Sequence, residues 1–323
     1  MNYPPYEISN NMLNTVANII NQIGEISNYF DFNKKPNLRK QNRINSIHSS
    51  LAIENNKLSK NQVKDIIDGH IVIGKQKDIM EVKNAYKAYE QIDSINPYNI
   101  EELKRIHGIM TFLTVEESGK FRNHNECVRD GEKVIFVAPP YPQFLNEIDE
   151  LFKWINKEKN NIHPLILSSV FHYEFLFIHP FSDGNGRMAR LWQTTILSKW
   201  KELFKYLPIE SMIKKYQKEY YDSIAISNIN GNSNVFVEFM LKMIYETILE
   251  TKKRYKKEND HNLNEIQNKI LKEIEKNPYI TQLELSNKLK VNRRTIIRYT
   301  NKMKVDNVII RKGNNRNGFW DIL

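Results

Sequence analysis

The chain has 323 residues, of which 40% are hydrophobic and 27% charged, a composition that is ordinary for a soluble globular protein. Its single cysteine, Cys127, excludes an intrachain disulfide and suits a reducing compartment, and the N-terminal residues carry no secretory signal, so we expect a cytoplasmic protein. The most apolar run, residues 164–178, is too short to cross a membrane and contains His172 and Glu174, so no membrane association is expected.

The net charge of +10 is unevenly distributed along the chain. Residues 252–323 contain 18 Lys and Arg but only 8 Asp and Glu, whereas residues 1–251 contain 30 of each. A basic segment attached to a neutral one is typical of a nucleic-acid-binding module joined to another domain. The chain is long enough for two such domains, each with its own core.

Apolar residues at helical spacing predict a mainly α-helical protein. The predicted helices cover residues 12–23, 37–54, a short stretch capped by Ser59, 79–94, 99–113, a stretch that ends near Lys157, 164–178, 187–197, 209–228 and 233–256. One β-hairpin is predicted from residues 125–137, because Asp130-Gly131 favours a tight turn between two strand-like runs.

The C-terminal part of the chain has a different pattern. Residues 252–262 are polar and basic, typical of a linker or a solvated helix end. Three short helices and a two-stranded wing are then expected within residues 263–323, where Thr281 and Glu284 form a capping box. This order resembles a winged helix-turn-helix domain.

The third of these helices is basic and favours DNA binding through residues 263–323. Its charged residues are Arg293, Arg294, Arg298, Lys302 and Lys304. The alternative is a module that docks a target protein or forms a homodimer, with a basic face that is simply solvated.

Residues 179–190 read H-P-F-S-D-G-N-G-R-M-A-R and contain the densest group of reactive side chains. A glycine-rich turn that leads into a helix presents free N–H groups and the positive end of the helix dipole, which favour an anion. Arg187 and Arg190 lie three residues apart, so both can bind phosphates from one helix face. Asp183 can hold a divalent metal ion, and His179 can take up a proton near neutral pH. This combination predicts a nucleotide-dependent transferase. The alternative is a structural corner between two helices with capping side chains, but such a corner would not need two arginines on one face together with a histidine.

The same twelve residues match every defined position of the motif H-x-F-x-[DE]-G-N-G-R-x-x-R, so the chain resembles the Fic family over about residues 100–230. Members of this family usually transfer AMP from ATP to a hydroxyl side chain of a target protein. The resemblance implies an ATP-dependent protein adenylyltransferase that uses Mg²⁺ and modifies a Ser, Thr or Tyr of a target, or of itself. Family members that act as kinases carry a bulkier residue and a lysine in the motif, so AMP transfer is favoured over phosphorylation.

The resemblance also implies a role for each polar group of the motif. His179 would deprotonate the target hydroxyl, and Asp183 would hold Mg²⁺ between the phosphates. The remaining phosphate ligands would be Gly184, Asn185 and Gly186 at the α-phosphate, and Arg187 and Arg190 at the β- and γ-phosphates.

Two further regions would complete this site. The second hairpin strand resembles the family's flap, which would border the bound ATP and on which an extended segment of the target protein docks by strand addition. It consists of Val134, Ile135, Phe136 and Val137. The family's adenine pocket is matched by Tyr220, Tyr221 and Asn228. A purely structural hairpin and ordinary core aromatic residues are the alternatives.

A second motif precedes the core. Residues 50–55 match the family's inhibitory motif [ST]-x-x-x-E-[GN], with Ser50, Glu54 and Asn55 at the defined positions. Their place in a helix of about residues 37–55 resembles the family's class II. The Glu54 carboxylate would reach Arg190 and occupy the place of the γ-phosphate. A surface glutamate near a helix end is the alternative.

The predicted protein is therefore an autoinhibited adenylyltransferase. It would comprise an N-terminal helical region (1–95), a helical Fic core with a hairpin flap (96–251), a basic linker (252–262) and a winged helix-turn-helix domain (263–323). Two alternatives stay open. In the first, Glu54 orients a water molecule that removes AMP from a modified target; in the second, a DNA-binding regulator senses ATP through its Fic domain.

Overall fold

The structure, a computed structural model, describes residues 4–29, 36–130, 132–306, 308–313 and 318–322. It is mainly α-helical, which confirms the fold class expected from the sequence. Two compact units, residues 1–249 and 250–323, each have their own apolar core. Within the described ranges, no helix is long and apolar enough to span a membrane.

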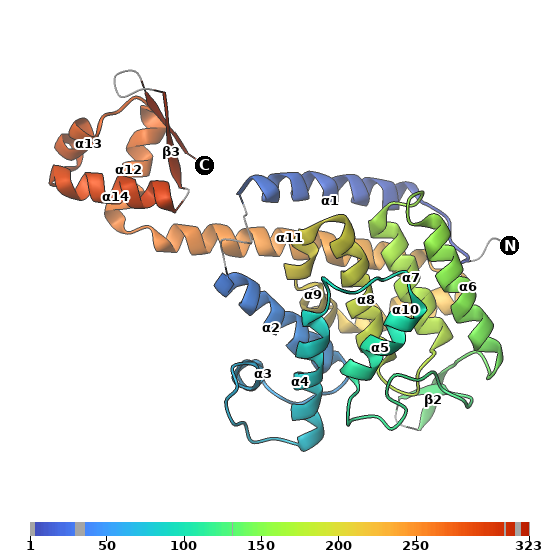
Figure 1. The fold of residues 1–323 in the computed structure, drawn as a ribbon. Coiled ribbons are helices and arrows are strands. Elements are labelled where there is room, and N and C mark those ends of the chain that lie inside the picture. Colours follow the sequence, from blue (N-terminus) through green and yellow to red (C-terminus); the bar gives the residue numbers. More distant parts are fainter. Residues whose placement is uncertain (1–3, 30–35, 131, 307, 314–317, 323) are drawn as a thin grey trace. The chain divides into compact units, whose positions relative to one another are not determined.

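The first unit is built almost entirely of helices (Figure 1). They are α1 (Asn10–Tyr29), α2 (Pro36–Ile53), α3 (Lys60–Ile67), α4 (Gln76–Glu90), α5 (Ile100–Met110), α6 (Gln143–Glu158), α7 (Pro164–Ile178), α8 (Asn185–Trp200), the 3-10 helix η2 (Glu202–Tyr206), α9 (Ile209–Lys215), α10 (Gln217–Asn230) and the start of α11 (Asn234–Asn262). The sequence predicts one helix over residues 209–228. The chain instead bends at Tyr216 (φ −111°, ψ 40°), which separates α9 from α10.

Helices α7 and α8 form the centre of this unit and pack against each other. Helix α7 is apolar on nearly all sides, as expected for a helix surrounded by protein. Helix α6 covers α7, while α2 contacts α4, α8 and α9. Helix α1 lies beside α11 (Figure 1), where the Ser9 hydroxyl donates a hydrogen bond to Glu238 at 2.6 Å. The motif at the α7–α8 junction is therefore supported from several sides.

The predicted hairpin consists of the antiparallel strands β1 (Cys127–Asp130) and β2 (Lys133–Val137). Its register pairs Cys127 with Val137 and Val128 with Phe136, and it is irregular after Val128. The turn residue Gly131 lies outside the described residues. The two strands form the only sheet within the described part of the first unit.

The second unit contains α12 (Glu265–Lys276), α13 (Gln282–Leu289), α14 (Arg293–Val305) and the antiparallel strands β3 (Ile309–Lys312) and β4 (Phe319–Ile322). Its core includes Ile270, Leu285 and Trp320, whose indole N–H donates to the Ile280 carbonyl at 2.9 Å. The expected winged helix-turn-helix architecture is confirmed, although residues 314–317 of the wing lie outside the described residues. Residues 252–262 are the C-terminal part of helix α11.

Candidate active site

The motif loop connects α7 to α8 and contains two residues with left-handed backbone conformations. His179 ends α7 with φ 52° and ψ 57°, and its N–H donates to the Phe175 carbonyl at 3.1 Å. Gly184, with φ 87°, precedes α8. A left-handed residue is a common way to end a helix, and Pro180 prevents the helix from continuing. The chain therefore reverses sharply and presents the start of α8 to the loop.

Asn185 holds this loop closed. Its side-chain oxygen accepts a hydrogen bond from the Phe181 N–H at 3.0 Å, and its side-chain nitrogen donates to the Phe181 carbonyl at 2.7 Å. The amide is buried and each of its ends has a partner in the loop, and the phosphate contact expected for Asn185 from the sequence stays a prediction. The first backbone N–H groups of α8, which have no acceptor within the helix and no side-chain cap, are also suited to an anion.

His107 supports the loop from the side of α5. Its ring stacks on Phe181 with a centroid distance of 3.6 Å. Nδ1 accepts a hydrogen bond from the Gly119 N–H at 3.0 Å, so the proton on Nε2 is donated to the Asp183 carbonyl at 3.0 Å. Burial lowers the pKa of His107 to about 4, which keeps the ring neutral in this tautomer. His107 therefore connects α5 to the motif loop.

The His179 ring is neutral near pH 7 and is oriented by the backbone of α7. Burial lowers the pKa of its partly buried ring, opposed by the backbone contact to Leu176 and by the charges of Glu126 and Glu54. Nδ1 lies 3.3 Å from the Leu176 carbonyl, an arrangement in which Nδ1 carries the proton and Nε2 offers a lone pair. A neutral imidazole with a free Nε2 can take a proton from a hydroxyl group.

The two motif arginines are both buried and both bound to carboxylates. Arg187 Nη2 lies 3.0 Å from Asp183 Oδ1, and Nη1 lies 3.4 Å from Glu81 Oε1 on α4. Glu81 also accepts a hydrogen bond from Asn56 at 2.9 Å. The sequence did not point to Glu81, because it belongs to no motif and lies 106 positions from Arg187. Asp183 is about half exposed and offers one carboxylate to a metal ion.

Arg190 is bound by Ser50 and Glu54, two residues of the predicted inhibitory motif. Its Nε donates to the Ser50 hydroxyl at 3.0 Å, and Nη2 donates to the Ser50 carbonyl at 3.0 Å and to Glu54 Oε1 at 2.8 Å. Burial is the largest single influence and lowers the pKa of Arg190, but Glu54, Tyr220 and Tyr89 together raise it by more, so the net shift is upward. Asn55, with φ 67°, ends α2 in the left-handed conformation that asparagine tolerates. The structure thus brings residues 50–55 to Arg190 and to the first turn of α8.

The Glu54 carboxylate also lies directly against Gly186, where a side chain of any other residue would collide with it. This position is the first turn of α8, where the free N–H groups and the helix dipole favour a negative charge. The carboxylate therefore occupies an anion site.

A cavity of about 210 Å³ opens next to this point. Its lining combines residues of the motif, the inhibitory segment, the flap and α10: Glu54, Val128, Ile135, Phe136, Leu176, Phe177, His179, Gly186, Arg190, Tyr220, Tyr221, Ile224, Ala225 and Asn228. Two side chains of α10 are held in place, because the Tyr220 hydroxyl contacts His172 Nε2 at 3.0 Å and Asn228 accepts from the Tyr173 hydroxyl at 2.8 Å.

The cavity includes only part of the expected flap. Ile135 and Phe136 line it, whereas Val134 and Val137 do not and are 41% and 69% exposed. The register passes over Ile135, because Phe136 pairs with Val128 and Val134 with Arg129. Such a bulge interrupts the alternation of side chains along a strand, so the neighbours Ile135 and Phe136 can both face the cavity. The apolar wall residues Val128, Leu176 and Ile224 were not anticipated, because apolar residues in a strand or helix carry no signal that separates a cavity wall from the core.

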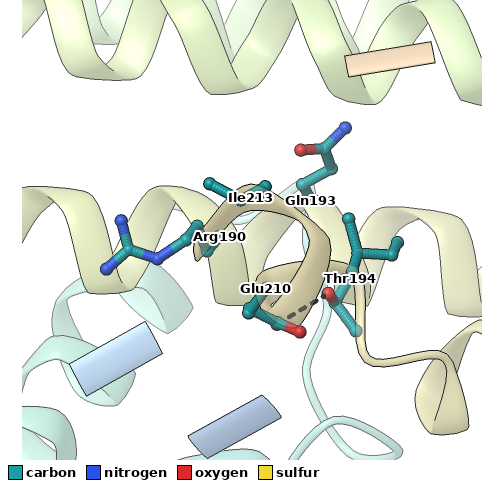
Figure 2. Close-up of a pocket in the computed structure, with 6 residues that line it drawn as sticks. Arg190, Gln193, Thr194, Glu210 and Ile213 are labelled. Atoms are coloured by element: carbon teal, nitrogen blue, oxygen red, sulfur yellow. Dashed lines mark hydrogen bonds between the residues drawn. The ribbon is translucent and has the colours of Figure 1, made fainter. Parts of the chain in front are cut away.

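A second, very narrow gap lies behind Arg190, between α8 and α9 (Figure 2). It is lined by Arg190, Gln193, Thr194, Ile209, Glu210 and Ile213 and has no space for a water molecule. The buried Glu210 carboxylate accepts hydrogen bonds from the Tyr89 hydroxyl at 2.7 Å and from Thr194 at 3.4 Å. This gap is a feature of the packing and not a ligand site.

Comparison with known proteins shows which family has this arrangement. The Fic/DOC family model matches residues 97–197, and the winged helix-turn-helix DNA-binding model matches residues 263–310. The crystal structure of a Fic family protein from Desulfovibrio desulfuricans G20 is 34% identical, with a TM-score of 0.74 over 100% of this chain and 98% of that one. The chain belongs to the Fic family.

Other Fic proteins match over a smaller part of their length. The "Protein adenylyltransferase Fic" of Culex quinquefasciatus is 30% identical over 220 residues, which are 65% of this chain and 41% of that protein. The chain therefore spans less than half of this curated relative. A Fic domain containing signaling protein from Bacteroides thetaiotaomicron has a TM-score of 0.59 over 74% of this chain at 19% identity, and it shares the fold.

Proposed function

We propose that this Fic protein is an ATP-dependent protein adenylyltransferase that transfers AMP to a hydroxyl side chain of a protein. One observation carries the proposal: His179, Gly186 and Arg190 line the same cavity as Tyr220 and Asn228. A neutral histidine and an anion site thus lie at one end of a slot with aromatic walls, the combination that nucleotide transfer requires. The adenylyltransferase name of relatives such as the Culex protein supports the same activity.

In this proposal the adenine base lies in the slot and the phosphates lie over the first turn of α8. Arg187 and Arg190 bind the β- and γ-phosphates, which stay on the leaving pyrophosphate. Mg²⁺ neutralises phosphate charge when it is bound. Asp183 fits such an ion, because Mg²⁺ takes one or two carboxylates and otherwise uses phosphate oxygens and water. Within the described residues, no group of three or more potential metal ligands would hold the ion without a nucleotide.

The protein side chains contribute the proton transfer and the orientation. His179 Nε2 takes the proton of the target hydroxyl as its oxygen attacks the α-phosphorus of ATP. The bond between the α-phosphorus and the bridging oxygen breaks, and pyrophosphate leaves. Such a reaction depends on positioning and charge neutralisation more than on covalent catalysis. The target segment docks on strand β2, where the exposed Val137 offers apolar surface.

We also propose that Glu54 restrains this activity. Its carboxylate occupies the anion site at Gly186 and pairs with Arg190, so a γ-phosphate there would have to displace it. The side chain is 36% exposed, which allows it to move without unfolding α2.

Incubation of the purified protein with Mg²⁺ and ATP labelled at the α-phosphate tests the activity. Label should enter the protein from α-labelled but not from γ-labelled ATP, because phosphorylation would transfer the γ-phosphate. His179→Ala should abolish transfer while ATP still binds. No transfer by either wild type or Glu54→Gly would refute the proposal, and release of AMP from labelled protein by wild type alone would assign the reverse reaction.

We propose DNA binding as a second function, located in the winged domain. The match to a winged helix-turn-helix DNA-binding model supports it, as do the exposed basic residues of α14. These are Arg293, Arg294, Arg298, Lys302 and Lys304. A basic helix on such a domain is suited to the major groove.

A further inference from the structure

Arg122 is a buried cation that lies outside the cavity but contacts the motif loop. Its side chain is almost fully buried, at 1% exposure. Nε donates to the His179 carbonyl at 2.8 Å, and Nη2 lies 3.4 Å from the Ile178 carbonyl. The backbone N–H of Arg122 donates to the Pro180 carbonyl at 3.0 Å. Three consecutive carbonyl groups, at the end of α7 and the start of the loop, are therefore bound by one residue.

The same guanidinium binds both ends of the flap. Nη1 donates to the His124 carbonyl at 2.6 Å, just before β1, and Nη2 donates to the Pro139 carbonyl at 2.6 Å, just after β2. The flap stem is closed further by a hydrogen bond from the Ala138 N–H to the Glu126 carbonyl at 3.1 Å. One planar group thus connects the two segments of the hairpin to the backbone of the catalytic histidine.

These contacts require an arginine. A guanidinium presents five N–H donors in a rigid plane, whereas a lysine ammonium is a compact charge on a flexible chain. The Arg122 plane also lies against the Phe144 ring, with 3.9 Å between its central carbon and the ring centroid. His179 needs such support, because a left-handed conformation is unfavourable for a residue other than glycine and persists only where the surroundings stabilise it.

We infer that Arg122 is a positioning residue that sets His179 and the flap in one fixed arrangement, so that a protein segment on β2 presents its hydroxyl to the His179 ring. This inference rests on the proposed transfer of AMP. Arg122 does not line the cavity, so its effect should fall on the transfer step and not on nucleotide affinity. Small errors in the placement of reacting groups reduce transfer rates strongly.

The test uses the full chain with Glu54→Gly as the parent, and measures the rate of self-labelling at saturating ATP together with the dissociation constant for ATP. Arg122→Lys should lower the labelling rate by about tenfold or more, because a misplaced base loses much of its effect. The ATP dissociation constant should change by less than about twofold. An unchanged labelling rate in folded Arg122→Lys would overturn the inference.

Phe152→Leu is the matched control. It removes a buried ring from the same helix, α6, and loosens the core at Phe171, whereas the guanidinium of Arg122 lies against a different ring, that of Phe144. Its labelling rate should stay near that of the parent even where its melting temperature falls. If Phe152→Leu and Arg122→Lys slow labelling equally at equal loss of stability, Arg122 has only a packing role and the inference fails.

A surface substitution makes the test independent of whether Arg122→Lys folds. The exposed Asn125 accepts a hydrogen bond from the Tyr141 N–H at 2.9 Å and so closes the same flap stem. Asn125→Ala should slow labelling without changing ATP affinity; an unchanged rate would overturn the coupling of the stem to His179. A parent that shows no labelling at all would instead refute the proposed function itself.

Discussion

Glu54 and Arg190 lie 136 positions apart in the chain, yet the carboxylate of the first accepts a hydrogen bond from the guanidinium of the second at 2.8 Å. Arg190 is almost fully buried, whereas the Glu54 side chain is 36% exposed. The arginine is therefore the fixed partner and the glutamate the one that can move. Because the pair lies at the start of α8, its opening would expose an anion site.

Replacement of Glu54 by glycine should raise self-labelling by about tenfold or more. The loss of a charged hydrogen bond of roughly 1.5–3 kcal/mol frees Arg190 for a phosphate, and this energy corresponds to that change in rate. The measurement is the initial rate of label transfer from α-labelled ATP. Glu101→Gln on α5, an exposed glutamate paired only with nearby Lys104 in the described structure, is the control and should have no effect. Equal rates for wild type and Glu54→Gly would mean that Glu54 does not inhibit.

The two arginines should respond differently to the loss of Glu54. In a chain that already carries Arg190→Ala, Glu54→Gly should change the labelling rate little, because the ion pair that it would remove is already lost. Residues that share one ion pair couple by roughly 0.5–3 kcal/mol. Arg187 has other partners, Asp183 and Glu81, so Arg187→Ala should reduce labelling by a similar factor with or without Glu54. A double-mutant cycle on the labelling rate decides this point. Full additivity between Glu54 and Arg190 would show that their contact does not control the rate.

Acid should destabilise the first unit through buried histidines. Burial lowers the pKa of His107 to about 4 and that of His172 to about 3. Between pH 6.5 and these values, the unfolded chain binds protons that the folded chain does not, so stability is lost as the pH falls. Over this range each histidine lowers the free energy of unfolding by up to about 1.4 kcal/mol for each pH unit of acidification. Urea unfolding of wild type and His107→Gln between pH 7 and 4.5 measures the effect, and the variant should show a shallower slope.

A rise in pH above 6.5 should destabilise the first unit through Glu174, because burial raises the pKa of this carboxyl to about 8. Between pH 4.5 and 8 the folded state holds a proton that the unfolded state has lost, so this group contributes stability that decreases as the pH rises. Below pH 6.5 the two histidines change the unfolding free energy with pH more than Glu174 does, and in the opposite direction. Above pH 6.5 only Glu174, among these three groups, changes it. The unfolding free energy should therefore be highest near pH 6.5. Glu174→Gln should remove the decline from pH 6.5 to 8; an identical decline in the variant would assign it to another group.

DNA binding by the winged domain should depend steeply on salt. Arg293→Gln and Arg298→Gln in the full chain should each reduce the slope of log affinity against log salt by about 0.9, if each side chain neutralises one phosphate. Lys269→Gln on α12, where the exposed lysine pairs with Glu265, is the control. Absence of binding by the wild-type chain to random duplex at low salt would leave the winged domain as a protein-docking module.

Much of this protein could be inferred from local sequence patterns. Helical periodicity, the Asp130-Gly131 turn and the capping boxes are short-range features, because backbone hydrogen bonds within a helix or a tight turn join residues near in sequence. The motif of residues 179–190 is equally local, since its groups lie on one loop and the first turns of one helix. The family and the mainly α-helical fold followed from these features.

Only the tertiary structure decided which distant residues meet. Glu81 reaches Arg187 from α4, Arg122 connects His179 to both ends of the flap, and Val134 lies outside the cavity that Ile135 lines. No periodicity encodes such contacts, because they depend on how helices pack and on which face of a strand is buried. Packing also decided what the Asn185 amide contacts, which is the Phe181 backbone of the loop that it closes. The sequence by itself determined the chemical groups and their local order, whereas packing determined which partners the buried polar groups have, because a polar group removed from water is stabilised by a hydrogen bond to a protein group that the fold brings to it.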